Sequence, residues 1–166
     1  MRRRYYLYGP PGAGKSTVGS LLAEELGLPF VDLDAAVAAG AGHPVDRILI
    51  EHGEPEFRQR ELRALQSLPG DDEVVVALGG GTLLNPECRS FVTRTGAVAL
   101  LTAAAECLDR RLKEDPAVRP LLSGENRHGL RSACRSHALR RKGEAPGRYL
   151  QARRGRSRSA EGHLLR

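Results

Sequence analysis

The sequence has no tryptophan, one methionine and three phenylalanines, and aromatic residues make up only 4% of its 166 residues. Its three cysteines, Cys88, Cys107 and Cys134, are odd in number and form no C-x-x-C pair. This pattern excludes a disulfide framework and a cysteine-rich zinc site, and it favours free thiols in a reducing compartment. Long apolar runs are also lacking, because the run that follows Met1–Arg4 stops at Gly9. Such a run is too short for export or for a membrane span, so we expect a soluble, cytoplasmic protein with no membrane partner.

The length is sufficient for one domain with a substantial core, but the charge is unevenly distributed. Residues 1–124 carry 14 basic and 17 acidic residues, a net charge of −3, whereas residues 125–166 carry 12 and 3, a net charge of +9. The overall charge of +6 therefore comes entirely from the C-terminal quarter. The electrostatics of the predicted folded domain give no reason to expect a nucleic-acid partner.

The strongest pattern is Gly9–Ser16, whose sequence GPPGAGKS matches the phosphate-binding motif G-x-x-x-x-G-K-[ST] at every fixed position. A β-prone run at residues 5–8 precedes it, and an apolar helical stripe follows it up to Gly27, a predicted C-cap. Backbone N–H groups and the helix dipole would face an anion there, and Lys15 would reach the outer phosphates. The motif therefore predicts binding of a nucleoside triphosphate.

Strand-like and helix-like segments alternate along the following residues. We expect strands at 30–34, 74–78 and 97–101, a loop containing Gly40, Gly42 and Pro44, and helices at 45–68 with a break near Gly53, at 86–93 and at 104–113. This alternation predicts an α/β fold with a parallel sheet and helices on both faces. The irregular segment at about 113–125 has the length of a lid, and it completes a predicted kinase core of residues 1–125.

Phosphoryl transfer requires a metal ion and an aligned acceptor as well as a phosphate cradle. Ser16 can ligate Mg²⁺ through its hydroxyl, and one nearby carboxylate often suffices as a further anchor. Asp32 and Asp34 end the second predicted strand, where one can serve the metal and the other the acceptor hydroxyl. Two acids at a strand end are equally typical of solvated caps.

Two later patterns suggest a binding site for the acceptor. Arg58 and Glu61 are three residues apart on one helical face, which fits either a surface ion pair or a guanidinium held toward a substrate carboxylate. The triple glycine Gly79, Gly80 and Gly81 follows a buried strand and lets the backbone approach a ligand closely. Arg119 on the predicted lid can close over the phosphates.

Taken together, these motifs resemble those of the shikimate kinase family. The resemblance rests on the extended loop pattern at 9–19, V-D-L-D at 31–34, E-x-x-F-R-x-x-E at 54–61, the triple glycine, and R-P-L-L at 119–122. It covers residues 5–124 and implies a P-loop three-layer fold with strand order 2-3-1-4-5. It further implies ATP-dependent phosphorylation of the 3-hydroxyl of shikimate, in aromatic amino-acid biosynthesis, by a monomer that uses Mg²⁺.

The resemblance also implies roles for individual residues. Lys15, Asp34 and Arg119 would be catalytic, and Ser16 and Asp32 would hold the metal. ATP would be bound by Gly12, Ala13, Gly14, Lys15, Ser16, Thr17, Arg111 and Arg119, with Arg110 competing with Arg111 for the adenine-stacking role. Shikimate would be bound by Asp34, Arg58, Glu61, Gly79, Gly80 and Gly81.

The C-terminal quarter departs from the family pattern. We find no fifth strand there and no clear second substrate arginine, for which Arg140, Arg141 and Arg148 are indistinguishable candidates. Its composition is that of a basic tail, and also that of frame-shifted GC-rich DNA. We therefore expect residues 126–166 to be poorly ordered or partly out of frame, and the enzyme to be weakly active or inactive. At residues 156–160, a shifted reading gives Val-Ala-Val-Gly for one choice of codons.

Two alternatives remain open from the sequence. One is another small-molecule kinase of the same fold, such as a gluconate kinase. The other is a catalytically impaired nucleotide-binding protein with a basic tail that binds nucleic acid or an acidic partner.

Overall fold

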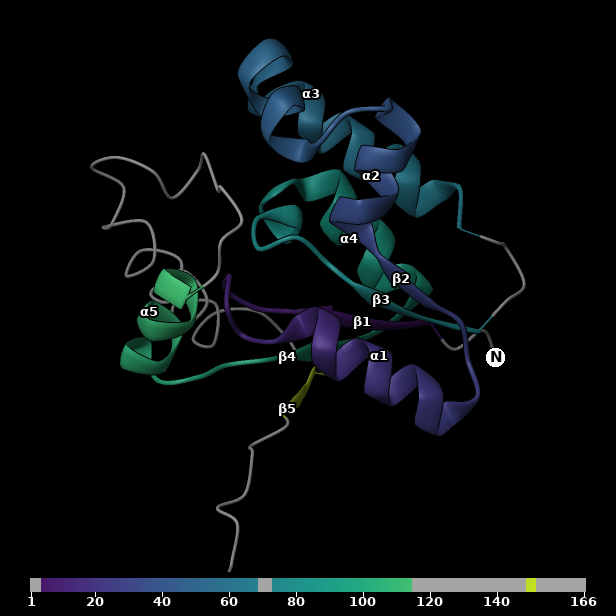
Figure 1. Ribbon diagram of the computed structural model, residues 1–166. Coiled ribbons are helices and arrows are strands. Elements are labelled where there is room, and N and C mark those ends of the chain that lie inside the picture. The colour runs from purple at the N-terminus through teal and green to yellow at the C-terminus, as the bar shows by residue number, and fades with distance from the viewer. Residues whose placement is uncertain (1–3, 69–72, 115–148, 152–166) are drawn as a thin grey trace, which may run out of the picture.

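The protein, described here from a computed structural model, is a five-stranded parallel sheet with helices on both faces (Figure 1). The structure describes residues 4–68, 73–114 and 149–151. In chain order the elements are β1 (Arg4–Tyr8), α1 (Lys15–Leu26), β2 (Phe30–Asp32), α2 (Leu33–Ala41), α3 (Val45–Gln66), β3 (Val74–Ala77), the 3-10 helix η1 (Thr82–Leu84), α4 (Pro86–Thr95), β4 (Gly96–Leu100), α5 (Ala105–Glu114) and β5 (Tyr149–Gln151). The strand order is β2-β3-β1-β4-β5, as predicted.

The sheet separates two apolar cores, because successive side chains of a strand point to opposite faces. Tyr6 of β1 and Val76 of β3 belong to the core that α3 and α4 cover. Leu7 and Val75, the neighbouring residues on the same strands, belong to the core that α1 covers. Figure 1 shows α1 on one side of the sheet and α3 and α4 on the other. Both faces of the central strands are therefore buried, which explains the unbroken valine run of β3.

A helix replaces the loop that we predicted after the second strand. Asp32 ends β2, and its Oδ1 accepts hydrogen bonds from the backbone N–H groups of Asp34 at 3.1 Å and Ala35 at 3.3 Å. This carboxylate caps α2, whose following residues are mostly alanine, the strongest helix former. The helix ends at Gly42, which has a φ of 68°. The loop prediction was wrong because it read Asp32 and Asp34 as strand residues instead of a cap and a first-turn acid.

The predicted break in the long helix is confirmed at Gly53. This residue has φ 77° and ψ 173° within α3, and Pro55 follows it. A third apolar cluster joins α2 to α3 through Val37, Ile48 and Phe57, so the helical pair forms a small lobe above the sheet. Among the described residues, no helix is long and apolar enough to cross a membrane.

The fifth strand, which the sequence analysis did not find, is present as β5. Tyr149, Leu150 and Gln151 pair in parallel with Val98, Ala99 and Leu100 of β4. The expectation of a missing strand was wrong because a three-residue edge strand is held by backbone hydrogen bonds and needs no apolar run of its own. The strand also lies before residues 156–160, where a shifted reading frame would have placed it. The predicted lid beyond Glu114 and the rest of the C-terminal segment lie outside the described residues.

Candidate active site

The glycine-rich loop connects β1 to α1 and holds a lysine ammonium at the start of the helix. Gly12 and Gly14 have φ values of 76° and 86°, which favour glycine, and Gly14 is the N-cap of α1. The Nζ of Lys15 donates hydrogen bonds to the backbone carbonyls of Gly9 at 3.0 Å and Pro10 at 3.2 Å. The ammonium therefore lies at the same place as the positive end of the helix dipole, where an anion is stabilised.

Close backbone contacts hold the loop on both sides. A Cβ on Gly9 would lie 2.2 Å from the carbonyl oxygen of Leu101, and a Cβ on Gly80 would lie 3.1 Å from Cδ of Pro11. The phosphate loop is thus packed against the end of β4 and against the triple glycine after β3. The two glycine motifs predicted from sequence meet at one end of the sheet.

Ser16 and Asp32 form a pair of oxygen ligands beside the loop. Ser16 Oγ donates a hydrogen bond to Asp32 Oδ2 at 2.5 Å, while Asp32 Oδ1 caps α2, so both carboxylate oxygens have fixed partners. Among the described residues, no group of three or more His, Cys, Asp or Glu side chains could hold a metal ion. One hydroxyl and one carboxylate fit Mg²⁺, because this ion keeps several waters and is usually bound by few protein ligands together with substrate phosphates.

Arg58 is held by two carboxylates against the triple glycine. Its Nη1 donates to Glu61 Oε2 at 2.7 Å, and its Nη2 donates to Glu54 Oε1 at 2.7 Å. The side chain of Glu61 is 0% exposed and that of Arg58 is 11% exposed. A Cβ on Gly81 would lie 2.3 Å from Nη2 of Arg58, so only glycine lets the guanidinium occupy this place. The predicted contact between Arg58 and Glu61 is present, and it is not a surface ion pair.

The protonation state of Glu61 is set by opposing influences. Burial raises the pKa of Glu61, and the Asp34 carboxylate raises it further, while the Arg58 guanidinium and the Thr82 hydroxyl lower it. Burial lowers the pKa of Arg58, but the carboxylates of Glu61 and Glu54 outweigh this effect and raise it. The charge of the buried Glu61 is therefore maintained by the contacts with Arg58 and Thr82, because little solvent reaches it.

Three oxygens converge on Gly79, the first residue of the triple glycine. A Cβ built on Gly79 would lie 2.8 Å from Glu61 Oε1, 2.9 Å from Asp34 Oδ1 and 2.9 Å from Thr82 Oγ1. One wall of the candidate site, beside Gly79, is therefore formed by Asp34 and Glu61. We predicted that Asp34 contacts the acceptor hydroxyls, and Glu61 is the residue that holds Arg58. Thr82 was not predicted, because a single threonine after three glycines gives no functional signal in the sequence.

The arginine candidates separate into those that the structure places and those that it does not. Arg111 Nη1 donates a hydrogen bond to the Gly12 carbonyl at 3.1 Å, which brings α5 to the phosphate loop, whereas Arg110 is exposed. Arg119 lies outside the described residues, as do the three candidates for a second substrate arginine. Thr17, in the first turn of α1, is exposed.

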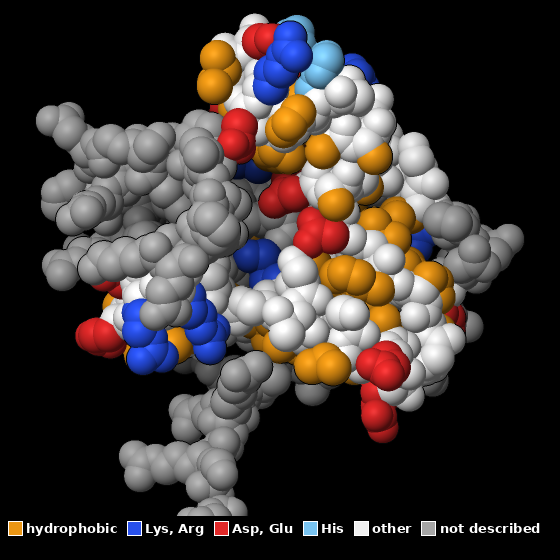
Figure 2. Space-filling view, viewed as in Figure 1, with side chains coloured by type: hydrophobic (Ala, Val, Ile, Leu, Met, Phe, Trp, Pro, Cys, Tyr) orange, Lys and Arg blue, Asp and Glu red, His pale blue; other side chains and the backbone are white. Residues whose placement is uncertain are grey.

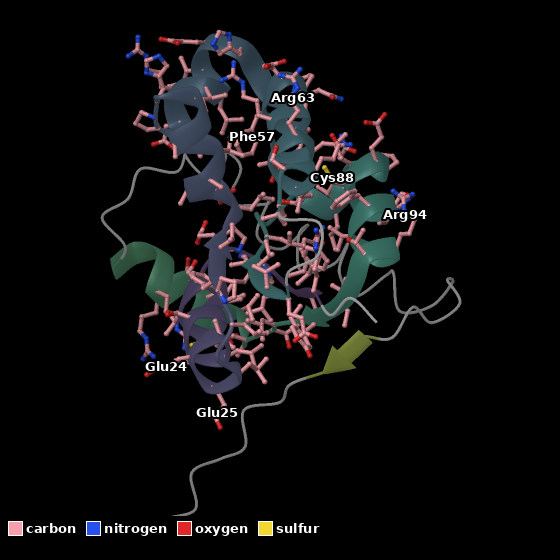
Figure 3. All side chains as sticks on the ribbon, turned by 90° about the vertical axis from the view of Figure 1, so that its right-hand side faces the viewer. Glu24, Glu25, Phe57, Arg63, Cys88 and Arg94 are labelled. Atoms are coloured by element: carbon pink, nitrogen blue, oxygen red, sulfur yellow. The ribbon has the colours of Figure 1, made fainter. Side chains whose placement is uncertain are left out.

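Charged side chains gather on the surface at this site, and a buried thiol lies behind it. Acidic and basic side chains meet at the centre of the face in Figure 2, between α2 and α3 above and α1 and α5 below. Behind this wall, Cys88 of α4 lies close to α3, with Phe57 farther along the same layer (Figure 3). Burial raises the pKa of Cys88 to about 11, and the nearby Glu61 carboxylate contributes to this rise. Cys88 is therefore a neutral thiol behind the Arg58 cluster.

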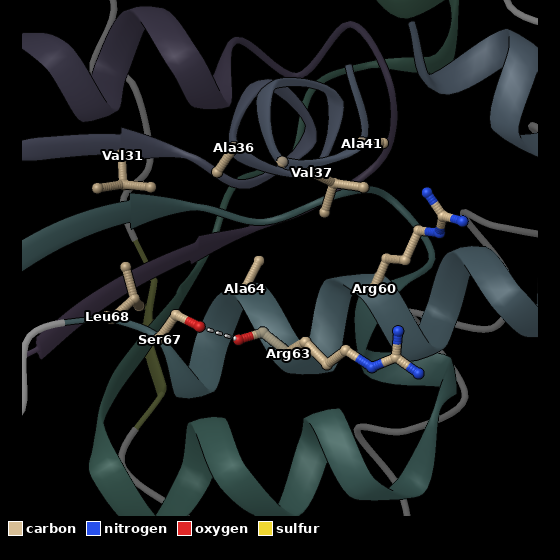
Figure 4. Close-up of a pocket in the computed structure, with 10 residues that line it drawn as sticks. Val31, Ala36, Val37, Ala41, Arg60, Arg63, Ala64, Ser67 and Leu68 are labelled. Atoms are coloured by element: carbon tan, nitrogen blue, oxygen red, sulfur yellow. Dashed lines mark hydrogen bonds between the residues drawn. The ribbon is translucent and has the colours of Figure 1, made fainter. Parts of the chain in front are cut away.

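A separate groove of about 530 Å³ lies between β2, α2 and α3 (Figure 4). Small side chains such as Ala36 and Ala64 form its walls, and Arg60 and Arg63 lie toward one end. None of the predicted site residues that the structure describes lines this groove. Arg60 faces the groove and is bound by Glu56 at 2.9 Å, so it provides a matched comparison for Arg58 on the same helix.

Sequence comparisons identify related proteins over most of the chain. A family model described as shikimate kinase matches residues 11–144. A shikimate kinase of Chlorobaculum parvum is 44% identical over 121 residues, which is 73% of this chain and 64% of that protein. A shikimate kinase of Chlorobium luteolum is 43% identical over 150 residues, 89% of this chain and 73% of that protein. The matched part of the chain thus spans less than two thirds of the length of the first of these relatives. The family match also continues past Glu125 into the basic segment.

Comparison with solved structures gives the same grouping. A shikimate kinase of Acinetobacter baumannii in complex with shikimate has a TM-score of 0.81 and 33% identity, with 94% of this chain and 86% of that chain covered. A gluconokinase of Sinorhizobium meliloti has a TM-score of 0.56 and 22% identity, with 91% and 83% covered. The second likeness shows a shared fold alone.

Proposed function

The chain belongs to the shikimate kinase family, and we propose that it transfers the γ-phosphoryl group of ATP to the 3-hydroxyl of shikimate in the cytoplasm. The observation that carries the proposal is the position of Arg58, whose largely buried guanidinium lies against Gly81, next to the Gly80 that packs on the phosphate loop, and therefore suits an acceptor that bears a carboxylate. The solved relative whose complex contains shikimate supports the same acceptor.

At the nucleotide end, the loop and the first turn of α1 supply backbone N–H groups, and Lys15 supplies a cation for the β- and γ-phosphates. Ser16 and Asp32 would hold Mg²⁺, which when bound neutralises charge on the phosphate oxygens. Arg111 is tied to the loop through Gly12 and would cover the adenine, and Arg119 would close from the lid. These groups orient the phosphates and stabilise negative charge, which is most of what phosphoryl transfer requires of a protein.

At the acceptor end, Arg58 would bind the carboxylate of shikimate. Its guanidinium has five N–H groups, and within the described residues three of them donate to Glu54 and Glu61. One N–H on each terminal nitrogen is left for a bidentate carboxylate contact. Glu61 is fully buried and is itself bound by Thr82, so it fixes the direction in which the guanidinium points.

Asp34 would orient the acceptor hydroxyl from the same wall. Its Oδ1 lies against Gly79, next to Glu61, at the end of the sheet where the phosphate loop also lies. A carboxylate there can accept the hydrogen bond of the hydroxyl that is phosphorylated, and it can take the proton as the new phosphoester forms. Arg58 and Asp34, which lie against Gly81 and Gly79, together suit a small acceptor that carries both a carboxylate and a hydroxyl.

Gluconate, the alternative acceptor, is tested by comparing its turnover with that of shikimate. Turnover with ATP and Mg²⁺ is measured by ADP release with shikimate or gluconate as the varied acceptor. We expect kcat/KM for shikimate to exceed that for gluconate by at least about two decades, as expected for a site that pairs buried polar groups with one substrate. Equal values, or a preference for gluconate, would reject shikimate as the acceptor.

A further inference from the structure

Thr82 is a buried hydroxyl residue to which the proposed reaction assigns no role. It is the first residue of η1, directly after the triple glycine, and it is 0% exposed. Its Oγ1 donates a hydrogen bond to Glu61 Oε1. A hydroxyl has a single proton to donate, and an ionised carboxylate can only accept, so this contact fixes the direction of the bond.

The contacts of Glu61 divide evenly between its two oxygens. Oε1 accepts from Thr82, and Oε2 accepts from Nη1 of Arg58 at 2.7 Å. Because the side chain is fully buried, no water can replace either donor without a rearrangement. A carboxylate with one oxygen held by η1 and the other by α3 has a fixed rotation about its terminal bond.

We propose that Thr82 is a positioning residue: its hydroxyl holds the Glu61 carboxylate in the orientation that directs Arg58 toward the carboxylate of the acceptor. The second half of this statement rests on the proposed function, whereas the hold of Thr82 on Glu61 does not. Side-chain oxygens of Thr82, Glu61 and Asp34 lie close together here, because each is within 2.9 Å of the position that a Cβ on Gly79 would occupy.

The charges that face Glu61 make this hydroxyl more important than an ordinary buried one. Arg58 lies on the same helix, the Asp34 carboxylate faces it from α2, and the Cys88 thiol lies on the side of α4. Burial and Asp34 raise the pKa of Glu61, and Arg58 and Thr82 are the groups that lower it. Without the hydroxyl, protonation of Glu61 becomes easier, and a protonated Glu61 no longer holds the guanidinium as an ion pair.

The variants Thr82→Val and Thr82→Ser separate the hydroxyl from the shape of the side chain. Valine keeps the branched shape and removes the donor, and serine restores the donor. We expect Thr82→Val to raise KM for shikimate about tenfold, because a Glu61 carboxylate that is no longer held directs Arg58 less well and weakens its bidentate contact with the acceptor carboxylate. KM for ATP should stay within about twofold, and Thr82→Ser should return KM for shikimate toward the wild-type value.

Thr95→Val is the matched control. The Thr95 hydroxyl is also partly buried, donating to the Phe91 carbonyl at 2.8 Å and contacting the Tyr6 hydroxyl at 2.8 Å, but it lies on α4 away from the site. This variant should lose a similar amount of thermal stability without changing either KM. Equal KM values for shikimate in Thr82→Val and wild type, or no recovery in Thr82→Ser, would overturn the proposal.

A second readout does not depend on turnover. In protein labelled with ¹³C at the glutamate carboxyls, Glu61 is assigned by the loss of its signal in Glu61→Gln, and its pKa is measured by titration. We expect Thr82→Val to raise the pKa of Glu61 and Thr95→Val to leave it unchanged. If this shift occurs and no variant phosphorylates shikimate, the proposed function fails while the hold of Thr82 on Glu61 stands; an unchanged pKa overturns the role of Thr82.

Discussion

Replacement of Arg58 by alanine should weaken the binding of shikimate and leave the binding of ATP almost unchanged. Two charge-assisted hydrogen bonds to the acceptor carboxylate would be lost, each worth about 1.5–3 kcal/mol. Because part of this loss is recovered by water, we expect about 3–4 kcal/mol in all, which raises KM for shikimate by about two to three decades. Arg58→Lys keeps a cation but not the bidentate geometry, so about one decade is expected.

The assay varies shikimate and ATP separately, and it compares shikimate with its methyl ester. The ester has no charge for Arg58 to bind, so wild type should discriminate strongly between the two acceptors and Arg58→Ala should barely discriminate. Arg60→Ala is the matched control, because Arg60 has a similar ion pair on the same helix but faces the groove. Equal increases in both KM values, or the same effect in Arg60→Ala, would refute the assignment of Arg58.

Removal of Arg58 also leaves the Glu61 carboxylate buried without its cation, and breaking a buried pair commonly costs about 3–5 kcal/mol of stability. Thermal unfolding of each variant therefore accompanies the kinetics. The double variant Arg58→Ala with Glu61→Gln removes the buried charge, and it should regain stability without regaining affinity for shikimate. Recovery of affinity would mean that Arg58 acts only through the fold.

Further predictions concern the loop, the buried acid, the buried thiol and the reading frame. Lys15→Ala should abolish turnover with any acceptor while circular dichroism stays unchanged, and retained turnover would contradict the nucleotide site. The pKa of Glu61 is raised in the folded state, so wild type should lose stability relative to Glu61→Gln as the pH rises from the ordinary glutamate pKa to the raised one; a difference independent of pH would contradict this. Cys88, with its pKa raised to about 11, should resist iodoacetamide at pH 8 until the protein unfolds, as peptide mass spectrometry can measure, and labelling as fast as that of Cys107 would contradict its burial. Sequencing of the coding DNA beyond the codon for Glu125 tests the proposal that part of the C-terminal segment is out of frame, and an intact frame there would reject it.

Much of the fold could be predicted because its signals are local. The phosphate loop is fixed by glycines and a lysine at set spacings, and the valine run of β3 has the composition of a strand buried on both faces. The helix α2 was missed because Asp32 can end a strand or cap a helix, and only the hydrogen bonds to Asp34 and Ala35 show which it does. β5 was missed because edge strands need little apolar sequence.

The candidate site was predictable only in part, for a related reason. The spacing of Arg58 and Glu61 predicts their contact, but their burial depends on α4 and on the triple glycine, which are distant in sequence. Arg110 and Arg111 could not be separated until the position of α5 was known, since adjacent helical residues point in different directions. Thr82 had no signal because a hydroxyl acquires its role only from the buried carboxylate that it meets.

The central claim is tested most directly by identifying the product. The protein is incubated with ATP, Mg²⁺ and shikimate, and the mixture is followed by ³¹P NMR with proton coupling. We expect a new phosphomonoester signal coupled to the proton on carbon 3 of shikimate, with an equal rise in ADP, and no such signal with Lys15→Ala. Binding of ATP without any phosphoester would contradict the proposed activity and favour a catalytically impaired nucleotide-binding protein.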